Sequence, residues 1–130
     1  MHDDTFIALI LRADYTKDGI VFFTPNNFSQ QLAYMNRPAG YMIAPHVHNR
    51  VIREVHYTQE VLFIKKGKVK IDFYNQAREF LESTVVSTGD VILLAGGGHA
   101  FTMLENTEII EVKQGPYVGE QDKTRFEPVG

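Results

Sequence analysis

The sequence predicts an all-β protein made of one domain, and two observations support that prediction. Almost no segment of the 130 residues has the apolar spacing of an amphipathic helix. Instead, short runs rich in β-branched and aromatic residues recur between turn signals, a pattern typical of a β-sandwich or β-barrel. No internal repeat, low-complexity tract or linker divides the chain, so we expect a single domain over residues 1–130.

The expected strands follow one another between segments rich in turn-forming residues. These turns are "TKDG" before Ile20, "RPAG" at 37–40, Gly67, "STGD" at 87–90 and "AGGG" at 95–98. We expect N-terminal strands in residues 1–40, a metal-binding barrel core in 41–113 and a polar, irregular tail in 114–130. The expected strands are Thr5–Leu11, Ile20–Thr24, Gln31–Asn36, Tyr41–His48, Glu60–Lys66, Lys68–Tyr74, Glu82–Val86, Asp90–Leu94, His99–Leu104 and Glu108–Lys113.

Composition excludes several classes of function. A net charge of -3 and a pI near 5.9 provide no basic field for nucleic acid. The absence of cysteine excludes disulfides, thiolate zinc sites and a cysteine nucleophile. The six-residue apolar run Phe6–Leu11 follows acidic residues, which is too short and wrongly flanked for a signal peptide or a membrane span. We therefore expect a cytoplasmic protein with no membrane partner.

Three histidines and one glutamate form the candidate metal site: His46, His48, Glu60 and His99. Neutral imidazole and carboxylate are ligands for divalent transition metals such as Fe, Mn, Ni or Zn. Side chains alternate between the two faces of a strand, so each candidate belongs to a row that is otherwise largely apolar. The rows are Met42, Ala44, His46 and His48; Glu60, Leu62 and Ile64; and His99, Phe101 and Met103.

Each of these residues also has an ordinary structural interpretation. A histidine on a strand is more often a surface or hydrogen-bonded core residue than a ligand, and His99 follows three glycines as a turn residue does. Glu60 can be a solvated carboxylate at a sheet edge, although it needs a partner if it is buried. Matched alternation on three strands favours the metal-site interpretation.

These residues resemble the two sequence motifs of the cupin superfamily. The first motif is matched by Gly40, the His-x-His pair of His46 and His48, Glu60 and Gly67, with eleven residues between His48 and Glu60, more than that motif usually has. We interpret the extra residues as a lengthened connection between strands. The second motif is matched by "GDVILLAGGGHAF", which keeps Gly89 and His99 but is one residue shorter; Ala95 replaces the usual proline, and Met103 the usual asparagine.

The resemblance implies a jelly-roll β-barrel, usually a homodimer, with one divalent metal held by His46, His48, Glu60 and His99. Cupin activities include dioxygenases, isomerases and lyases, beside members without catalysis, so the fold settles little about function. The ending "VKQGPYVGEQDKTRF" is similar to short cupins of sugar and surface-polysaccharide gene clusters, which implies a sugar-derived or small oxo-acid substrate. The apolar edge strand Thr5–Leu11 also favours pairing with a second chain.

Five further residues are candidates for the substrate site. His56 has a pKa range suited to a general base, and Tyr34 is a second candidate for proton transfer. Arg50, Arg53 and Arg37 are candidates for binding a carboxylate or phosphate, because guanidinium offers paired donors; surface arginines are the ordinary alternative. The function expected is that of a metal-dependent dioxygenase or isomerase/lyase. The alternatives are a non-catalytic sugar- or metabolite-binding protein and a metal-free protein similar to the cupin-like epimerases that use a His–Asp pair.

Overall fold

Antiparallel strands make up nearly all the regular structure of this protein. The structure is a computed structural model that describes residues 6–128. That range contains the strands β1 (Ala8–Leu11), β2 (Gly19–Phe22), β3 (Ala33–Asn36), β4 (Glu60–Lys66), β5 (Lys68–Tyr74), β6 (Phe80–Ser87), β7 (Val91–Leu94), β8 (Gly98–Met103) and β9 (Glu108–Lys113), followed by the short 3-10 helix η1 (Gly119–Asp122). Thr5, the expected first residue of the first strand, lies outside the described residues, as do 129–130 in the tail. The predicted all-β class is confirmed.

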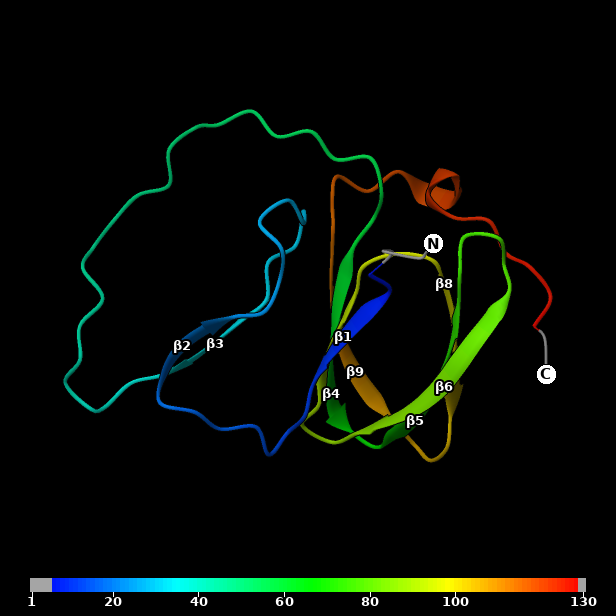
Figure 1. Ribbon diagram of the computed structural model, residues 1–130, viewed down its shortest axis with the longest axis horizontal. Helices are drawn as coiled ribbons and strands as arrows, with labels where there is room; N and C mark the ends of the chain where they lie inside the picture. The colour runs from blue at the N-terminus through cyan, green and yellow to red at the C-terminus, as the bar shows by residue number, and fades with distance from the viewer. Residues whose placement is uncertain (1–5, 129–130) are drawn as a thin grey trace.

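The strands form three sheets (Figure 1). One sheet has the order β1-β7-β4-β9, a second has the order β6-β5-β8, and β2 pairs with β3 in a separate hairpin. The first two sheets face each other and form the body of the molecule. Over residues 6–128 no hydrogen-bonded ladder joins the sheets into a ring, so the sequence-predicted jelly-roll barrel stays a prediction.

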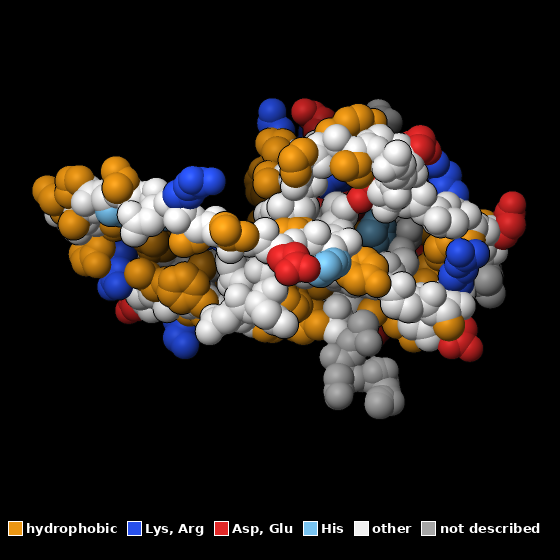
Figure 2. Space-filling view, turned by 90° about the horizontal axis from the view of Figure 1, so that it is seen from above, with side chains coloured by type: hydrophobic (Ala, Val, Ile, Leu, Met, Phe, Trp, Pro, Cys, Tyr) orange, Lys and Arg blue, Asp and Glu red, His pale blue; other side chains and the backbone are white. Residues whose placement is uncertain are grey.

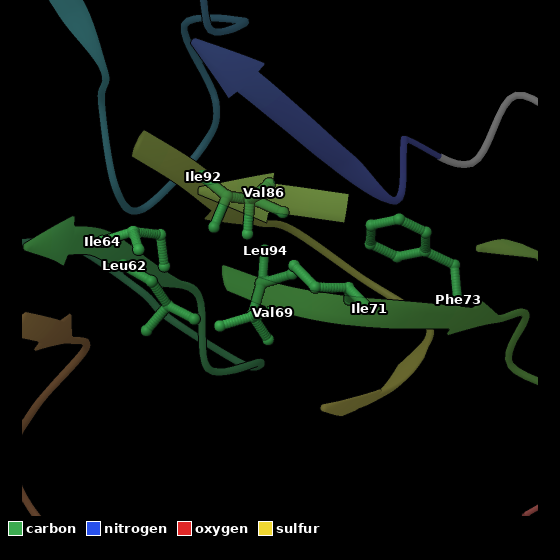
Figure 3. Close-up of a cluster of buried hydrophobic side chains, with 8 residues drawn as sticks. All are labelled: Leu62, Ile64, Val69, Ile71, Phe73, Val86, Ile92 and Leu94. Carbon is green, nitrogen blue, oxygen red and sulfur yellow. The ribbon is translucent and has the colours of Figure 1, made fainter. Parts of the chain in front are cut away.

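The core lies between the two sheets of the body (Figure 3). In β4 the side chains of Leu62 and Ile64 are buried while Phe63 is exposed, the alternation expected of a strand with one inner face. β5 presents Val69 and Ile71 to the same interior. The full cluster of buried residues is Leu62, Ile64, Val69, Ile71, Phe73, Val86, Ile92 and Leu94.

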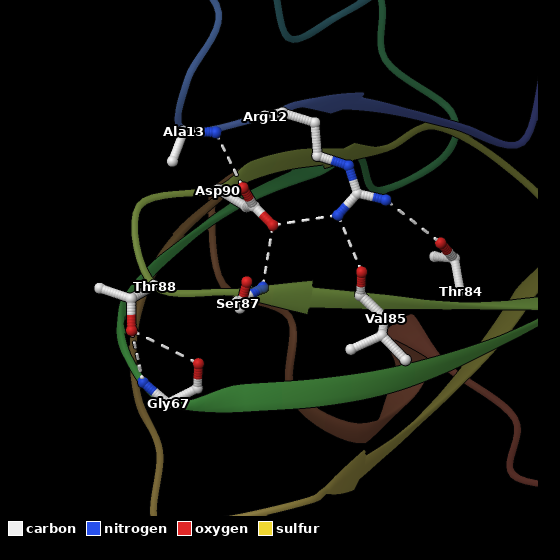
Figure 4. A network of polar contacts seen from close by, with 8 residues as sticks. All are labelled: Arg12, Ala13, Gly67, Thr84, Val85, Ser87, Thr88 and Asp90. Atoms are coloured by element: carbon white, nitrogen blue, oxygen red, sulfur yellow. Dashed lines mark hydrogen bonds and ion pairs between the residues drawn. The ribbon is translucent and has the colours of Figure 1, made fainter.

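A buried aspartate ties β1 to the turn between β6 and β7 (Figure 4). Asp90 accepts hydrogen bonds from the backbone N–H groups of Ala13 and Ser87, each at 2.8 Å, and from the Arg12 guanidinium at 3.1 Å. Arg12 also donates to the carbonyl of Val85 at 2.8 Å. Because a buried carboxylate needs donors on its oxygens, these contacts fix the end of β1 against the turn.

Glycine is required at the connection between β4 and β5. Gly67 has φ +113°, in the region that side chains rarely adopt. A Cβ atom there would lie 2.5 Å from Thr107 Oγ1. The backbone N–H of Gly67 also donates to Thr88 Oγ1 at 3.0 Å. The turn predicted at Gly67 is therefore confirmed, and it brings the β6–β7 turn and the β8–β9 connection together.

One predicted strand is wrong. Residues Tyr41–His48 carry no regular structure, and the segment 37–57, here called the arm, leaves β3 in a wide arc and returns towards β4 (Figure 1). Within the arm, the backbone N–H of Tyr41 donates a hydrogen bond to the carbonyl oxygen of Pro38 at 3.2 Å. A strand needs a partner for its backbone groups, and Pro45, in the middle of the expected strand, has no N–H to donate. Alternation of side chains alone therefore did not produce a strand.

The other predicted strands are present, and their ends differ by a few residues. The bounds of Glu60–Lys66, Lys68–Tyr74 and Glu108–Lys113 agree with the sequence-based expectation. β1 begins at Ala8, later than expected, and β6 begins at Phe80 instead of Glu82.

We expect Asp90→Ala to lower the free energy of unfolding by about 2–4 kcal/mol, because it leaves the part-buried N–H groups of Ala13 and Ser87 without an acceptor and removes the ion pair with Arg12. Asp18→Ala, which removes an exposed carboxylate, is the matched control and should change stability by less than about 0.5 kcal/mol. Urea unfolding followed by circular dichroism measures both. Equal effects of the two substitutions would contradict the structural role given to Asp90.

Candidate functional site

The structure brings Glu60 and His99 together on the inner face of the body. Glu60 opens β4 and continues the buried row of Leu62 and Ile64. His99 lies opposite the buried Phe73 in the β5–β8 ladder, and residues opposite each other in an antiparallel pair point to the same face. The His99 Nε2 and Glu60 Oε1 atoms are 3.3 Å apart. The inward direction predicted for both side chains is confirmed.

His99 and Lys113 stabilise the charge of Glu60. Its side chain is only 12% exposed, and Lys113 Nζ lies 3.7 Å from its second oxygen, Oε2. The hydrogen bond with His99 lowers the pKa of Glu60 most; burial acts in the opposite direction, and the nearby His99 and Lys113 charges lower the pKa further. The net result is a pKa below the ordinary value, so the carboxylate is ionised at neutral pH.

Lys113 and Glu111 belong to this site, and the sequence reasoning missed them. Lys113 lies directly opposite Glu60 in the β4–β9 ladder and is 3.4 Å from Glu111. Partial burial disfavours the charged form of Lys113, but the carboxylates of Glu111 and Glu60 outweigh it and raise the pKa. The signal was present in the alternation of Ile109, Glu111 and Lys113, whose row faces inward. Composition alone does not identify which of the two faces of β9 points inward.

A tight glycine turn sets the position of His99. Gly97 has φ +66°, and a Cβ atom at this residue would overlap the carbonyl oxygen of Tyr74. The glycine therefore allows the chain to pass close to β5 immediately before β8 begins at Gly98. This agrees with the sequence-based expectation that the glycine run forms a tight connection between strands.

His46 and His48 form a second pair, located in the arm. Their ring centroids are 5.4 Å apart, and both residues are exposed. The Nδ1 atom of His46 lies 2.9 Å from the carbonyl oxygen of Ala44. A ring nitrogen beside a carbonyl donates its hydrogen, which leaves the His46 Nε2 lone pair available for a ligand bond, as is usual for histidines that bind metals.

The structure does not join the two pairs. Glu60 lies beside His99 and His46 lies near His48, but across residues 6–128 no three His, Asp or Glu side chains are grouped as a metal-binding set. The pairs are separated because the arm leaves the body, whereas the predicted site required residues 41–48 to be a strand of the barrel.

The geometry of the Glu60–His99 pair nonetheless fits two ligands of one metal ion. Donor atoms about 2.1 Å from an ion are separated by about 3.0 Å in octahedral and about 3.4 Å in tetrahedral coordination. The observed separation of 3.3 Å between Nε2 and Oε1 lies in that range. The ionised state of Glu60 is the one that binds a metal. This pair alone supplies half of a four-ligand site.

Two of the five substrate-site candidates share a cleft, and the other three lie elsewhere. His56 and Arg53 line a cleft of about 1170 Å³ between the end of the arm, the loop at 26–31 and the C-terminal tail. His56 contacts Glu54 at 2.9 Å and is well exposed. Arg37 stacks on the ring of Tyr41, 4.6 Å from its centroid.

Tyr34 and Arg50 are separate from this cleft. Tyr34 packs edge-on against Tyr15, with ring centroids 4.9 Å apart, and its hydroxyl is 3.5 Å from Thr16 Oγ1. Arg50 is exposed on the arm. The structure therefore groups only His56 and Arg53 of these five candidates in one cavity.

Comparison with family models, curated proteins and solved structures gave no significant match. The chemistry of the site is therefore argued from its residues. In the part of the chain that the structure describes, no helix has the length and apolar character needed to cross a membrane.

We expect Lys113→Gln to raise the pKa of Glu60, because the ammonium group favours the ionised carboxylate. Lys65→Gln is the control, since Lys65 lies in the same sheet but pairs with Glu108. NMR titration of the Glu60 side-chain carboxyl carbon measures the pKa in both variants. A Glu60 pKa unaffected by Lys113→Gln would contradict the electrostatic role of Lys113.

Proposed function

We propose that this chain is a metal-binding protein of cupin type that acts on a small molecule. The observation that supports the proposal best is the close contact of an ionised, buried Glu60 with His99 on the inner face of the body. The proposed ligands are His46, His48, Glu60 and His99, around one divalent ion such as Fe, Mn, Ni or Zn. The proposal includes a jelly-roll arrangement of the strands, a cytoplasmic location and a homodimer.

Glu60, His99 and Lys113 each have a distinct role in the proposed metal site. Glu60 and His99 would supply a carboxylate and an imidazole ligand from the inner faces of the two opposing sheets. Lys113 lies against the other oxygen of Glu60, which restricts the rotation of the carboxylate and keeps Oε1 turned towards His99. These residues would hold an ion that, when bound, could supply Lewis-acid polarisation of a carbonyl or enediolate oxygen of the substrate.

The substrate proposed is a sugar derivative or a small oxo-acid. The cleft lined by His56 and Arg53 also includes Lys113, and Lys113 contacts Glu60, so the cleft reaches the neighbourhood of the proposed metal ligands. Arg53 offers paired donors to a carboxylate, and His56 is the proposed general base. An isomerase, lyase or dioxygenase is the proposed activity.

A second candidate function needs no metal, and the same contact favours it. A carboxylate beside His99 orients the imidazole, as in histidine–carboxylate pairs that act as general acid and base. In this case Glu60 and His99 would move a proton on the substrate directly. Stoichiometric metal in the purified or Zn²⁺-loaded protein would favour the first function over this one.

We expect His46→Ala and His99→Ala each to lower metal content by about tenfold or more, while circular dichroism shows that the fold is kept. Metal per chain is measured by inductively coupled plasma mass spectrometry after loading with Zn²⁺ and gel filtration. His56→Ala is the matched control, because it removes a histidine that is not a proposed ligand; its metal content should be unchanged and its turnover altered. Full metal content in a variant lacking both His46 and His99 would reject the ligand assignment.

Turnover separates an enzyme from a protein that only binds its ligand. The Zn²⁺-loaded and Fe²⁺-loaded proteins are incubated with a panel of sugars and oxo-acids, and products are followed by NMR. Conversion of any of them supports the enzyme. Binding measured by calorimetry without conversion would instead support the non-catalytic metabolite-binding alternative.

A further inference from the structure

The arm exposes an unusual amount of apolar surface (Figure 2). Ile52 is 96% exposed, Val47 85% and Met42 77%, and orange side chains crowd the part of the molecule that projects away from the body. Soluble proteins rarely present contiguous apolar surface of this kind unless a partner covers it. The exposed large apolar residues of the arm are Tyr41, Met42, Ile43, Val47, Val51, Ile52, Val55 and Tyr57.

The arm also lacks partners for its backbone. Its N–H and C=O groups between residues 42 and 57 form no backbone–backbone hydrogen bond with any other described residue, although the alternation of Met42, Ala44, His46 and His48 is that of a strand. An extended segment with these properties gains most by adding to the free edge of a sheet.

Such an edge is present beside His99. In the sheet β6-β5-β8, β8 pairs with β5 on one side, and no described strand pairs with the other side. The inner row of β8 includes His99 and Phe101, which lie opposite the buried Phe73 and Ile71. A strand added at this edge would present one of its two rows to the same interior.

The His46–His48 pair and the Glu60–His99 pair are complementary. Residues 41–48 supply two imidazoles without a carboxylate, and the body supplies one imidazole in contact with the carboxylate of Glu60. We propose that residues 41–48 of one chain add to the free edge of β8 in a second copy, where His46 and His48 complete the metal site begun by Glu60 and His99. This inference rests on the proposed function, and it names the partner as a second copy of the chain.

A second copy would provide partners for two features that lack them in one chain, the β2–β3 hairpin and the free edge of β8. The β2–β3 hairpin at the root of the arm forms a sheet of its own, and an isolated hairpin is marginally stable without a surface to pack on. In a two-fold dimer each arm covers the body of the other chain, so both hairpins and both free edges gain partners at once. Each dimer then contains two sites, and each site draws ligands from both chains.

Mixing of complementary variants tests this assembly. One variant carries His46→Ala and His48→Ala, and the other carries Glu60→Gln and His99→Ala; neither can form a complete site by itself. The two are unfolded together, refolded at equal concentration and loaded with Zn²⁺. Metal content should recover to about a quarter of the wild-type value, because about half of the dimers are mixed and each mixed dimer has one intact site of two.

The outcomes separate the inference from the proposed function. If the wild type binds Zn²⁺ and the mixture binds none, the site is formed within one chain and the inference is overturned. If the wild type itself binds no Zn²⁺, the proposed function fails, and the arm exchange is then judged by solution mass: a monomeric wild type overturns it and a dimer that depends on the arm supports it. Should Glu60→Gln impair folding, His99→Ala alone replaces the second variant.

Charge placed on the arm tests its docking without any metal. We expect Met42→Asp with Ala44→Asp to convert the dimer to a monomer in analytical ultracentrifugation, because these residues share the inward row of His46 and His48, and a buried strand face does not accept unpaired carboxylates. Val118→Asp, at an exposed apolar residue of the tail, is the matched control and should leave the dimer intact. A dimer that survives the arm substitutions would contradict the inference.

Discussion

The pairing of β4 with β7 and β9, and its packing against β5, decides where the reactive groups of the body lie. Leu62 and Ile64 fill the space between the sheets together with Val69 and Ile71. Because strand side chains alternate, Glu60 must point into the same interior. The backbone ladder then places Lys113 directly opposite Glu60. The core and the candidate site are therefore set by one register, and a shift of one residue would turn the whole row outward.

Burial of Glu60 explains why acidic and basic side chains lie together at this end of the body. A carboxylate removed from water is costly unless cations and donors surround it. His99 and Lys113 provide these, and Glu111 in turn lies against Lys113. A metal ion at this place would serve the same electrostatic purpose for Glu60 as a protonated His99. The two proposed functions, with and without a metal, would thus use the same pair of residues.

The sequence predicted the body of the protein well because alternation and turns are local signals. The bounds of β4, β5 and β9 and the inward direction of Glu60 and His99 follow from the spacing of apolar residues. Lys113 was missed because the two faces of β9 are hard to rank by composition alone. The separation of His46 from His99 was missed for another reason: side-chain alternation says which residues share a face, and it says nothing about which strand supplies the backbone partner.

The arm is where sequence pattern and chain structure disagree, and the disagreement has a physical explanation. Val47 and Ile52 are among the most exposed apolar side chains of the described residues, yet Met42, Ala44, His46 and His48 keep the alternation of a strand with one buried face. A segment with that pattern can bury one face as a strand only when its backbone groups pair with a neighbouring strand. β8 offers an open edge next to His99, and the chain carries two imidazoles within residues 41–48 and one beside Glu60. A second copy satisfies the backbone of the arm, its apolar surface and the ligand set together, which no single feature of the isolated chain does.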